Sequence, residues 1–181
     1  MSDAQAGGST ELGPESPQAT AMAWVEAVMD RGDLTAAWPL TDPSLRLVLA
    51  QEWVWAHRHD PAVGHQADWD SLAADLAAAA PDEPLWDRFA RERVTEWHRV
   101  WKGFSARRWR VWDEPEVMGL DLEMVTFVEP SDLPLPAARR RRVGLERRFL
   151  LRHESGRWLV AGVNGERRFR PGWPPSMEPP D

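Results

Sequence analysis

The chain contains no cysteine and no tyrosine, and Lys102 is its only lysine. Without cysteine it has no disulfides, thiolate nucleophiles or zinc–thiolate sites, which fits a reducing compartment such as the cytoplasm. Without tyrosine it has no phenol that could act as a general acid or donate to an oxyanion. The heavy use of Ala, Arg, Pro and Trp, with 12 tryptophans, is typical of coding bias in a high-GC bacterium such as an actinobacterium.

Long hydrophobic runs are also absent. No apolar run approaches the roughly 20 residues that span a bilayer, and residues 1–20 have neither the basic nor the apolar region of a secretory signal. The formal net charge of −7 disfavours nucleic acid and anionic lipid as partners. Hydrophobic residues make up 43% of the 181 residues, which is enough for the core of one domain. We therefore expect a soluble, cytoplasmic protein that binds neither membranes nor nucleic acid.

The composition of the two ends differs from that of the middle. Residues 1–19 are rich in Gly, Pro and Ser, and residues 167–181 are rich in Pro. Such segments bury too little apolar surface to offset the entropy lost on ordering. We predict a disordered leader over residues 1–19, a single domain over residues 20–166, and a proline-rich tail over residues 167–181, which Trp173 could pin to the domain.

Apolar residues in the N-terminal half recur at the spacing of amphipathic helices. Thr20 can cap the first helix, and Asp42 can cap a helix that begins at Pro43. Gly32 and Gly103 are placed to end helices. The predicted helices span residues 20–31, 43–58, 70–80 and 84–102, with a short helical segment at 34–40.

After Gly103 the apolar period changes to two, which is typical of strands. The predicted strands span residues 107–112, 117–128, 139–152 and 157–164, with a proline-rich loop at 129–138. The last two strands form a hairpin around residues 153–156. Helices followed by antiparallel strands define an α+β fold, since each amphipathic face needs a partner.

The closing hairpin, Arg-Phe-Leu-Leu-Arg to Gly-Arg-Trp-Leu-Val-Ala-Gly-Val over residues 148–163, follows this helical half. The layout resembles the nuclear transport factor 2-like, cystatin-like cone, which includes the SnoaL-like polyketide cyclases. The resemblance implies N-terminal helices on a curved antiparallel sheet of about four strands, and a homodimer packed through that sheet. The chain departs from the family because residues 43–80 are helical where such cones insert a strand pair. It also lacks the tyrosine of the isomerase and dehydratase relatives, so no family catalytic residue is transferred to it.

Glu52 and Arg93 each interrupt an otherwise apolar helical stripe. A buried charge without a partner is too costly to keep, so each residue should have one, and they could serve each other. One interpretation is a structural ion pair between two helices. The other is that both face a cavity and bind a polar ligand, together with Trp97 and Trp101. The tryptophans are also explained as core residues, which is the interpretation we favour.

Asp121 and Glu123 share one face of a predicted strand, and His98 could lie across the mouth of the cone. Together they are the candidate catalytic residues for proton transfer. The alternative is an exposed strand face whose acids pair with Arg142 and Arg148 on a neighbouring strand.

Two further clusters carry weaker signals. His57, His59, Asp60 and His65 have loose metal-ligand spacing, but they follow a helix end where solvated histidines are common, so we predict no metal site. The run 139–142 is entirely arginine and could bind phosphate. We interpret it as a solvated charge cluster that protects a strand edge.

These observations lead to three functional hypotheses. The first is a non-catalytic domain, without a cofactor, that binds a small apolar or partly polar molecule or another protein. The second is a SnoaL-like, cofactor-free isomerase, dehydratase or cyclase in which Arg93 holds an anionic group. The third is a structural or regulatory subunit of a larger enzyme, docked through its flexible ends.

Overall fold

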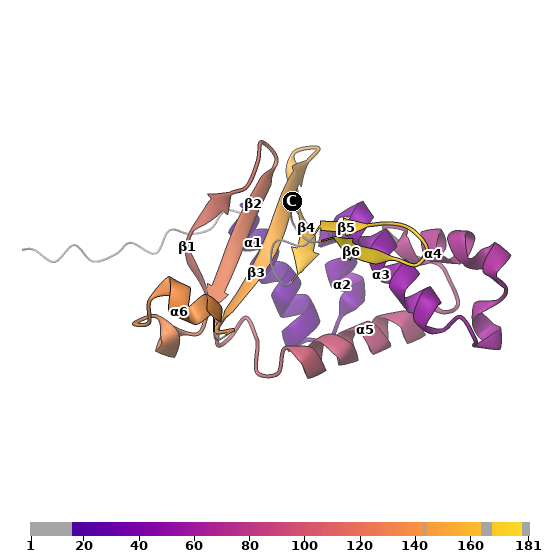
Figure 1. Ribbon diagram of the computed structural model, residues 1–181, viewed down its shortest axis with the longest axis horizontal. Coiled ribbons are helices and arrows are strands. Elements are labelled where there is room, and N and C mark those ends of the chain that lie inside the picture. Colours follow the sequence, from indigo (N-terminus) through magenta and orange to yellow (C-terminus); the bar gives the residue numbers. More distant parts are fainter. Residues whose placement is uncertain (1–15, 143, 164–167, 179–181) are drawn as a thin grey trace, which may run out of the picture.

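The computed structural model describes residues 16–142, 144–163 and 168–178, and over these ranges the chain is an α+β protein, as predicted (Figure 1). Helices pack on a curved four-stranded antiparallel sheet, and a two-stranded sheet contacts α3 on the helical side. None of the described helices has the length and apolar character that a bilayer crossing requires. Residues 1–15 of the predicted leader and residues 164–167 lie outside the described residues.

The first helix begins earlier than predicted. Helix α1 (Pro17–Val25) continues as a π-helical turn (Glu26–Asp30). Its cap is Ser16, whose hydroxyl accepts a hydrogen bond from the amide of Ala19 at 3.1 Å, so residues 17–19 form its first turn. Thr20 is buried inside the helix and does not cap it.

Helix α3 (Pro43–Ala56) begins where the sequence predicts. The Asp42 carboxylate accepts from the amide of Ser44 at 2.8 Å, and Pro43 occupies the first helical position. The backbone amide of Asp42 donates to the carbonyl of Val160 at 2.8 Å. The capping residue therefore also joins this helix to the edge of the sheet.

The other predicted helices are confirmed, with ends within a few residues of the predicted ones. No strand is found between α3 and α4 in the described chain, as expected from the helical pattern of residues 43–80. The helices are α2 (Leu34–Ala37), which continues as a 3-10 turn (Trp38–Leu40), α4 (Trp69–Ala77) and α5 (Trp86–Val100).

The main sheet is a simple meander in which each strand pairs antiparallel with the next. The predicted closing hairpin is confirmed, and Ser155 and Gly156 turn the chain with φ of 52° and 81°. Only glycine adopts such angles without strain, which explains Gly156. The strands are β1 (Arg110–Val117), β2 (Leu122–Val128), β3 (Glu146–Glu154) and β4 (Arg157–Val163).

Two strand predictions are wrong. Residues 117–128 are not one strand, because the chain turns between β1 and β2 at residues 118–121. The apolar alternation runs on through that turn, where Leu120 is fully exposed. Residues 139–142 are not strand either, because they belong to helix α6 (Ala137–Arg142).

The tail contains ordered structure. Strands β5 (Arg168–Arg170) and β6 (Ser176–Glu178) pair as a small antiparallel sheet. Between them Trp173 pins the segment as predicted: its indole lies 5.5 Å from the ring of Trp69, and its Nε1 donates to Asp70 at 2.5 Å.

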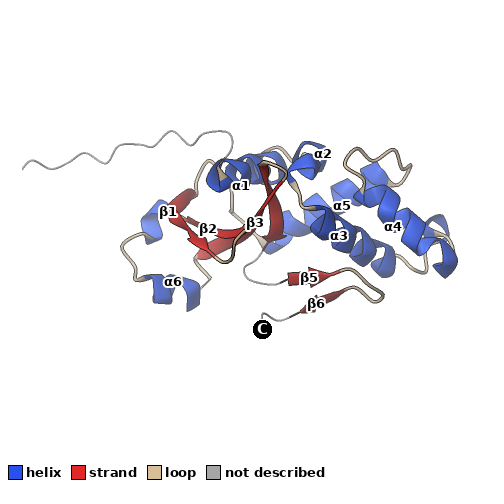
Figure 2. Cartoon of the chain, turned by 90° about the horizontal axis from the view of Figure 1, so that it is seen from above, coloured by secondary structure: helices blue, strands red, loops and turns tan. Residues whose placement is uncertain are grey.

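Aromatic rings fill the space between the helices and the sheet. Helix α1 contacts all four strands, and Figure 2 shows it lying over the sheet. The ring of Phe149 in β3 lies 5.6 Å from Trp24 and 5.8 Å from Trp101. Phe104 packs edge-on against Phe127 at 5.6 Å, which closes the layer toward β2. Such rings contribute large buried areas and fix the helices on the sheet.

Candidate functional site

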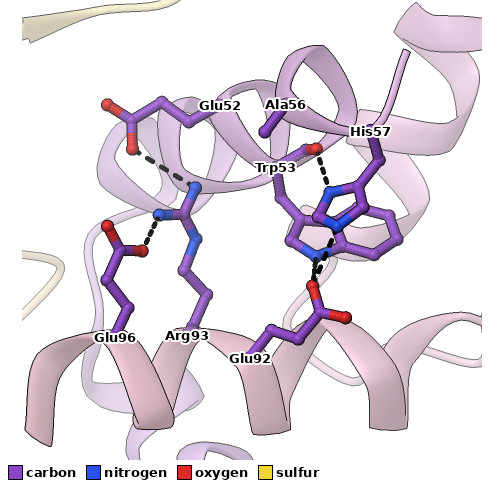
Figure 3. A pocket seen from close by; sticks show the side chains of 7 residues that line it. All are labelled: Glu52, Trp53, Ala56, His57, Glu92, Arg93 and Glu96. Atoms are coloured by element: carbon purple, nitrogen blue, oxygen red, sulfur yellow. Dashed lines mark hydrogen bonds and ion pairs between the residues drawn. The ribbon is translucent and has the colours of Figure 1, made fainter. Parts of the chain in front are cut away.

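A groove of about 330 Å³ lies between α3 and α5, on the helical side of the molecule (Figure 3). Both helices turn charged side chains toward each other here. Its lining residues are Glu52, Trp53, Ala56, His57, Glu92, Arg93 and Glu96.

Arg93 forms the predicted pair with Glu52. Its Nη2 lies 3.3 Å from Glu52 Oε2 and donates to the carbonyl of Leu49 at 2.7 Å. Its Nη1 donates to Glu96 at 2.9 Å. Figure 3 shows both carboxylates turned toward the guanidinium. The ion pair between two helices is therefore formed, and it lines one side of the groove.

Burial changes the acidity of Glu52. Desolvation raises the pKa of Glu52, and the attraction of Arg93 opposes this effect without cancelling it. The neighbouring Glu96 adds to the rise in pKa, because two negative charges in one place disfavour each other. This carboxyl therefore takes up a proton more readily than an exposed glutamate does.

The other side of the groove centres on Glu92. Trp53 Nε1 donates to Glu92 at 2.8 Å, and His57 Nε2 lies 3.1 Å from the same carboxylate. Arg88 adds a bond to Glu92 at 3.0 Å and another to Asp60 at 2.7 Å. Burial alone would raise the pKa of Glu92, but the bonds from Trp53 and Arg88 outweigh it and hold that pKa below its usual value.

Sequence reasoning missed this half of the groove. His57 was expected to be solvated, but it is half-buried, with Nδ1 2.9 Å from the carbonyl of Trp53. His59 and His65 are exposed as expected. In the described part of the chain, no group of three or more His, Asp and Glu side chains is placed to hold a metal ion.

Trp97 and Trp101 do not line the groove. Both are buried in the aromatic core, where their rings stack at 6.2 Å. Of the four predicted ligand-binding residues, Glu52 and Arg93 line the groove, whereas Trp97 and Trp101 lie in the core.

The three candidate catalytic residues are not brought together. His98 Nε2 lies 3.1 Å from the carbonyl of Val28 on the helical side. Asp121 lies in the β1–β2 turn, 3.8 Å from Arg152, and Glu123 lies in β2. Figure 1 shows α5 at one end of the sheet and the β1–β2 turn at the other.

The ion pairs of the sheet also differ from those expected. Arg148 bonds to Glu116 at 2.8 Å and Arg152 approaches Asp121, so the sheet acids do pair across strands. The side chain of Arg142 lies outside those described.

The arginine run is not a fully solvated cluster. Arg140 is buried with its Nε 3.1 Å from Glu146, and its guanidinium lies 4.8 Å from the Trp112 ring. It also donates to the carbonyls of Leu133, at 3.3 Å, and Leu135. Arg139 and Arg141 are exposed, as predicted.

The tip of the β1–β2 hairpin is a second feature that the sequence did not reveal. Leu120 is fully exposed, Val117 is 73% exposed and Met118 is 39% exposed. The available signal was Gly119 between apolar residues, because a glycine inside a strand pattern indicates a bend.

Comparison of the chain with protein-family models, with curated proteins and with solved structures found no match in any of the three.

Proposed function

We propose that this chain is a non-catalytic binding protein whose partner is another protein, docked at the β1–β2 tip. The observation that carries this proposal is the exposure of Val117, Met118 and Leu120, three apolar residues within four positions of one hairpin. Clustered apolar side chains at a protruding turn are costly in water, whereas isolated ones are common. A partner that covers them offsets this cost.

The charge around the tip indicates what the partner presents. Residues 111–128 contain five acids and no basic residue. Arg148 and Arg152 neutralise part of this charge from β3. We infer a partner with an apolar pocket rimmed by Lys or Arg, since complementary charge speeds association and excludes wrong partners. A second copy of the same acidic tip would be repelled.

The enzyme hypothesis has less support. His98 lies on α5, away from Asp121 and Glu123, and aromatic rings fill the space between the helices and the sheet. Proton transfer needs an acid and a base within hydrogen-bond reach of one substrate.

The small-molecule hypothesis rests on the groove between α3 and α5. Its side chains largely satisfy one another: Arg93 with Glu52 and Glu96, and Glu92 with Trp53. This pattern is typical of an ion network that ties two helices together. Ligand binding by Glu52 and Arg93 therefore stays a prediction.

We further propose that the fold is a divergent nuclear transport factor 2-like cone in a cytoplasmic protein. The support is the order of its parts, with α1 across all four strands and a closing β3–β4 hairpin. A homodimer packed through the sheet is what that resemblance implies. A partner docked at the β1–β2 tip would leave the face of the sheet available for such a dimer. Docking at the tip also fits the hypothesis that the chain is a subunit of a larger enzyme.

A photo-crosslinking amino acid at position 120 tests the docking proposal in cells that express the chain. The matched control carries the same probe at Asp87, an exposed position on α5. We expect a discrete adduct with another protein from position 120 alone, and its loss when Glu114 and Glu116 are replaced by Lys. Equal adducts from both positions, no adduct, or an adduct only with a second copy of the chain would contradict the proposal.

A further inference from the structure

Three arginines are buried among the residues whose side chains the structure describes, and one of them differs from the others. Arg93 bonds to Glu96 and to the carbonyl of Leu49, and only its Nε has no partner in the described structure. Arg140 bonds to Glu146 and to two backbone carbonyls. Arg46 in α3 is 8% exposed, and its Nε and Nη1 are buried without a hydrogen-bond partner in the described structure. A buried guanidinium is stable only when its donors find acceptors.

The nearest acid to Arg46 is already engaged. Asp42, one turn earlier, attracts Arg46, but one of its oxygens caps α3 and the other accepts from Arg152 at 2.8 Å. Burial lowers the pKa of Arg46, and the positive charge of Arg157 lowers it further. The repulsion from Arg157 therefore outweighs the attraction of Asp42.

Two other arginines lie on the sheet beside it. Arg152 in β3 stands opposite Leu159 in β4, and Arg157 is two residues before Leu159, so both arginines project from the same face of the sheet. Arg157 is exposed and Arg152 is half-buried, so both can be reached from solvent. Glu154, opposite Arg157, is an exposed acid that offsets part of this charge.

We propose that Arg46, Arg152 and Arg157 form a binding site for the phosphate or carboxylate group of a small anionic ligand. The planar guanidinium matches both groups, because it offers paired N–H donors in a fixed geometry. The buried Arg46 supplies the donors that lack acceptors, and the two sheet arginines, which solvent reaches, supply further positive charge. This site is distinct from the α3–α5 groove and does not depend on docking at the hairpin tip.

The test is titration of the full chain with sodium phosphate and, separately, with sodium acetate, each against sodium chloride at equal ionic strength. Melting temperature and calorimetry report binding. We expect at least one of the two anions to raise the melting temperature and to bind saturably. Whichever anion has the lower Kd identifies the ligand group.

Three variants make the result specific. Arg46→Met should abolish the response and, without the anion, should melt a few degrees higher than the unchanged chain. Arg157→Gln should weaken binding about tenfold or more, as expected for the loss of one charge-assisted contact. Arg91→Gln removes the same charge from an exposed position on α5 and should leave Kd unchanged.

The proposal is overturned if neither anion shifts the melting temperature beyond the chloride control. It is also overturned if Arg46→Met responds like the unchanged chain. Should Arg46→Met not fold, Arg157→Gln decides the question, and an unchanged Kd in that variant counts against the site.

Discussion

Arg140 and Arg46 lie toward opposite edges of the sheet and have opposite surroundings. Arg140 belongs to a run of four arginines, yet it is buried against Glu146 and stacks on Trp112 of β1. Arg46 lies in an apolar helix near β4, where Arg157 is close and no acceptor meets its buried nitrogens within the described residues. A buried charge does not always have a partner, and whether it has one determines whether it stabilises the fold.

The largest predicted effect comes from removing the buried ion pair of Arg140 and Glu146. Arg140→Met leaves Glu146, whose side chain is 4% exposed, without its buried partner. We expect a loss of about 3–5 kcal/mol in the free energy of unfolding, measured by urea denaturation. Arg139→Met, at an exposed neighbouring position, is the control. Equal losses in the two variants would show that the pair with Glu146 is not what stabilises this region.

An intermediate effect is expected at the α3–α5 groove. Arg93→Met leaves Glu52 and the carbonyl of Leu49 without their donor, but Glu52 and Glu96 keep part of their exposure to water. We expect a loss of about 1–3 kcal/mol, again by urea denaturation. A loss as large as that of Arg140→Met would contradict the distinction between the two sites.

Arg46→Met should raise the free energy of unfolding, whereas the two preceding substitutions lower it. In a buffer free of phosphate and carboxylate, we expect a gain of about 1 kcal/mol, because a buried charge without an acceptor is replaced by an apolar side chain of similar length. Thermal and urea unfolding measure it. A loss instead of a gain would remove the contrast with Arg140.

The smallest effect concerns Glu52 and depends on pH. The folded-state pKa of Glu52 is raised above its ordinary value of 4.5 by burial, so its contribution to stability is complete below that value and is lost as pH rises through the folded pKa. Glu52→Gln removes this loss. Between pH 4 and pH 7 we expect the free energy of unfolding of the variant to rise relative to that of the unchanged chain, by about 1 kcal/mol or less.

Unfolding free energies measured at several pH values test this expectation, with Glu83→Gln, outside the groove, as the control. If the free energy of unfolding of Glu52→Gln decreased relative to that of the unchanged chain as pH rises, the attraction of Glu52 to Arg93 would outweigh the cost of burying Glu52.

Part of the candidate site could be predicted from sequence. Glu52 and Arg93 were recognisable because each interrupts an apolar helical stripe, and a charge in such a stripe needs a partner. Glu92 and His57 were not, because Glu92 lies on the polar side of α5 and only the packing of α3 brings His57 to it. Arg46 was missed although it also lies among buried residues of a helix.

The difference between local sequence patterns and contacts made by packing also explains the wrong strand predictions. Residues 117–128 alternate as one strand would, apart from Gly119, and the pairing of β1 with β2 shows that the chain reverses at residues 118–121. Residues 139–142 lack a helical apolar stripe, yet they form a helix from which Arg140 reaches Glu146 and Trp112.

By itself the sequence determined helices α1 to α5, the closing hairpin, the α+β class and the acidic charge, since spacing, caps and turn residues act within a few positions of one another. The tertiary structure alone decided which buried arginine meets a carboxylate, which tryptophans enter the core, and which apolar residues remain in water at the β1–β2 tip. These outcomes depend on contacts between segments far apart in the chain, and local periodicity does not encode such contacts.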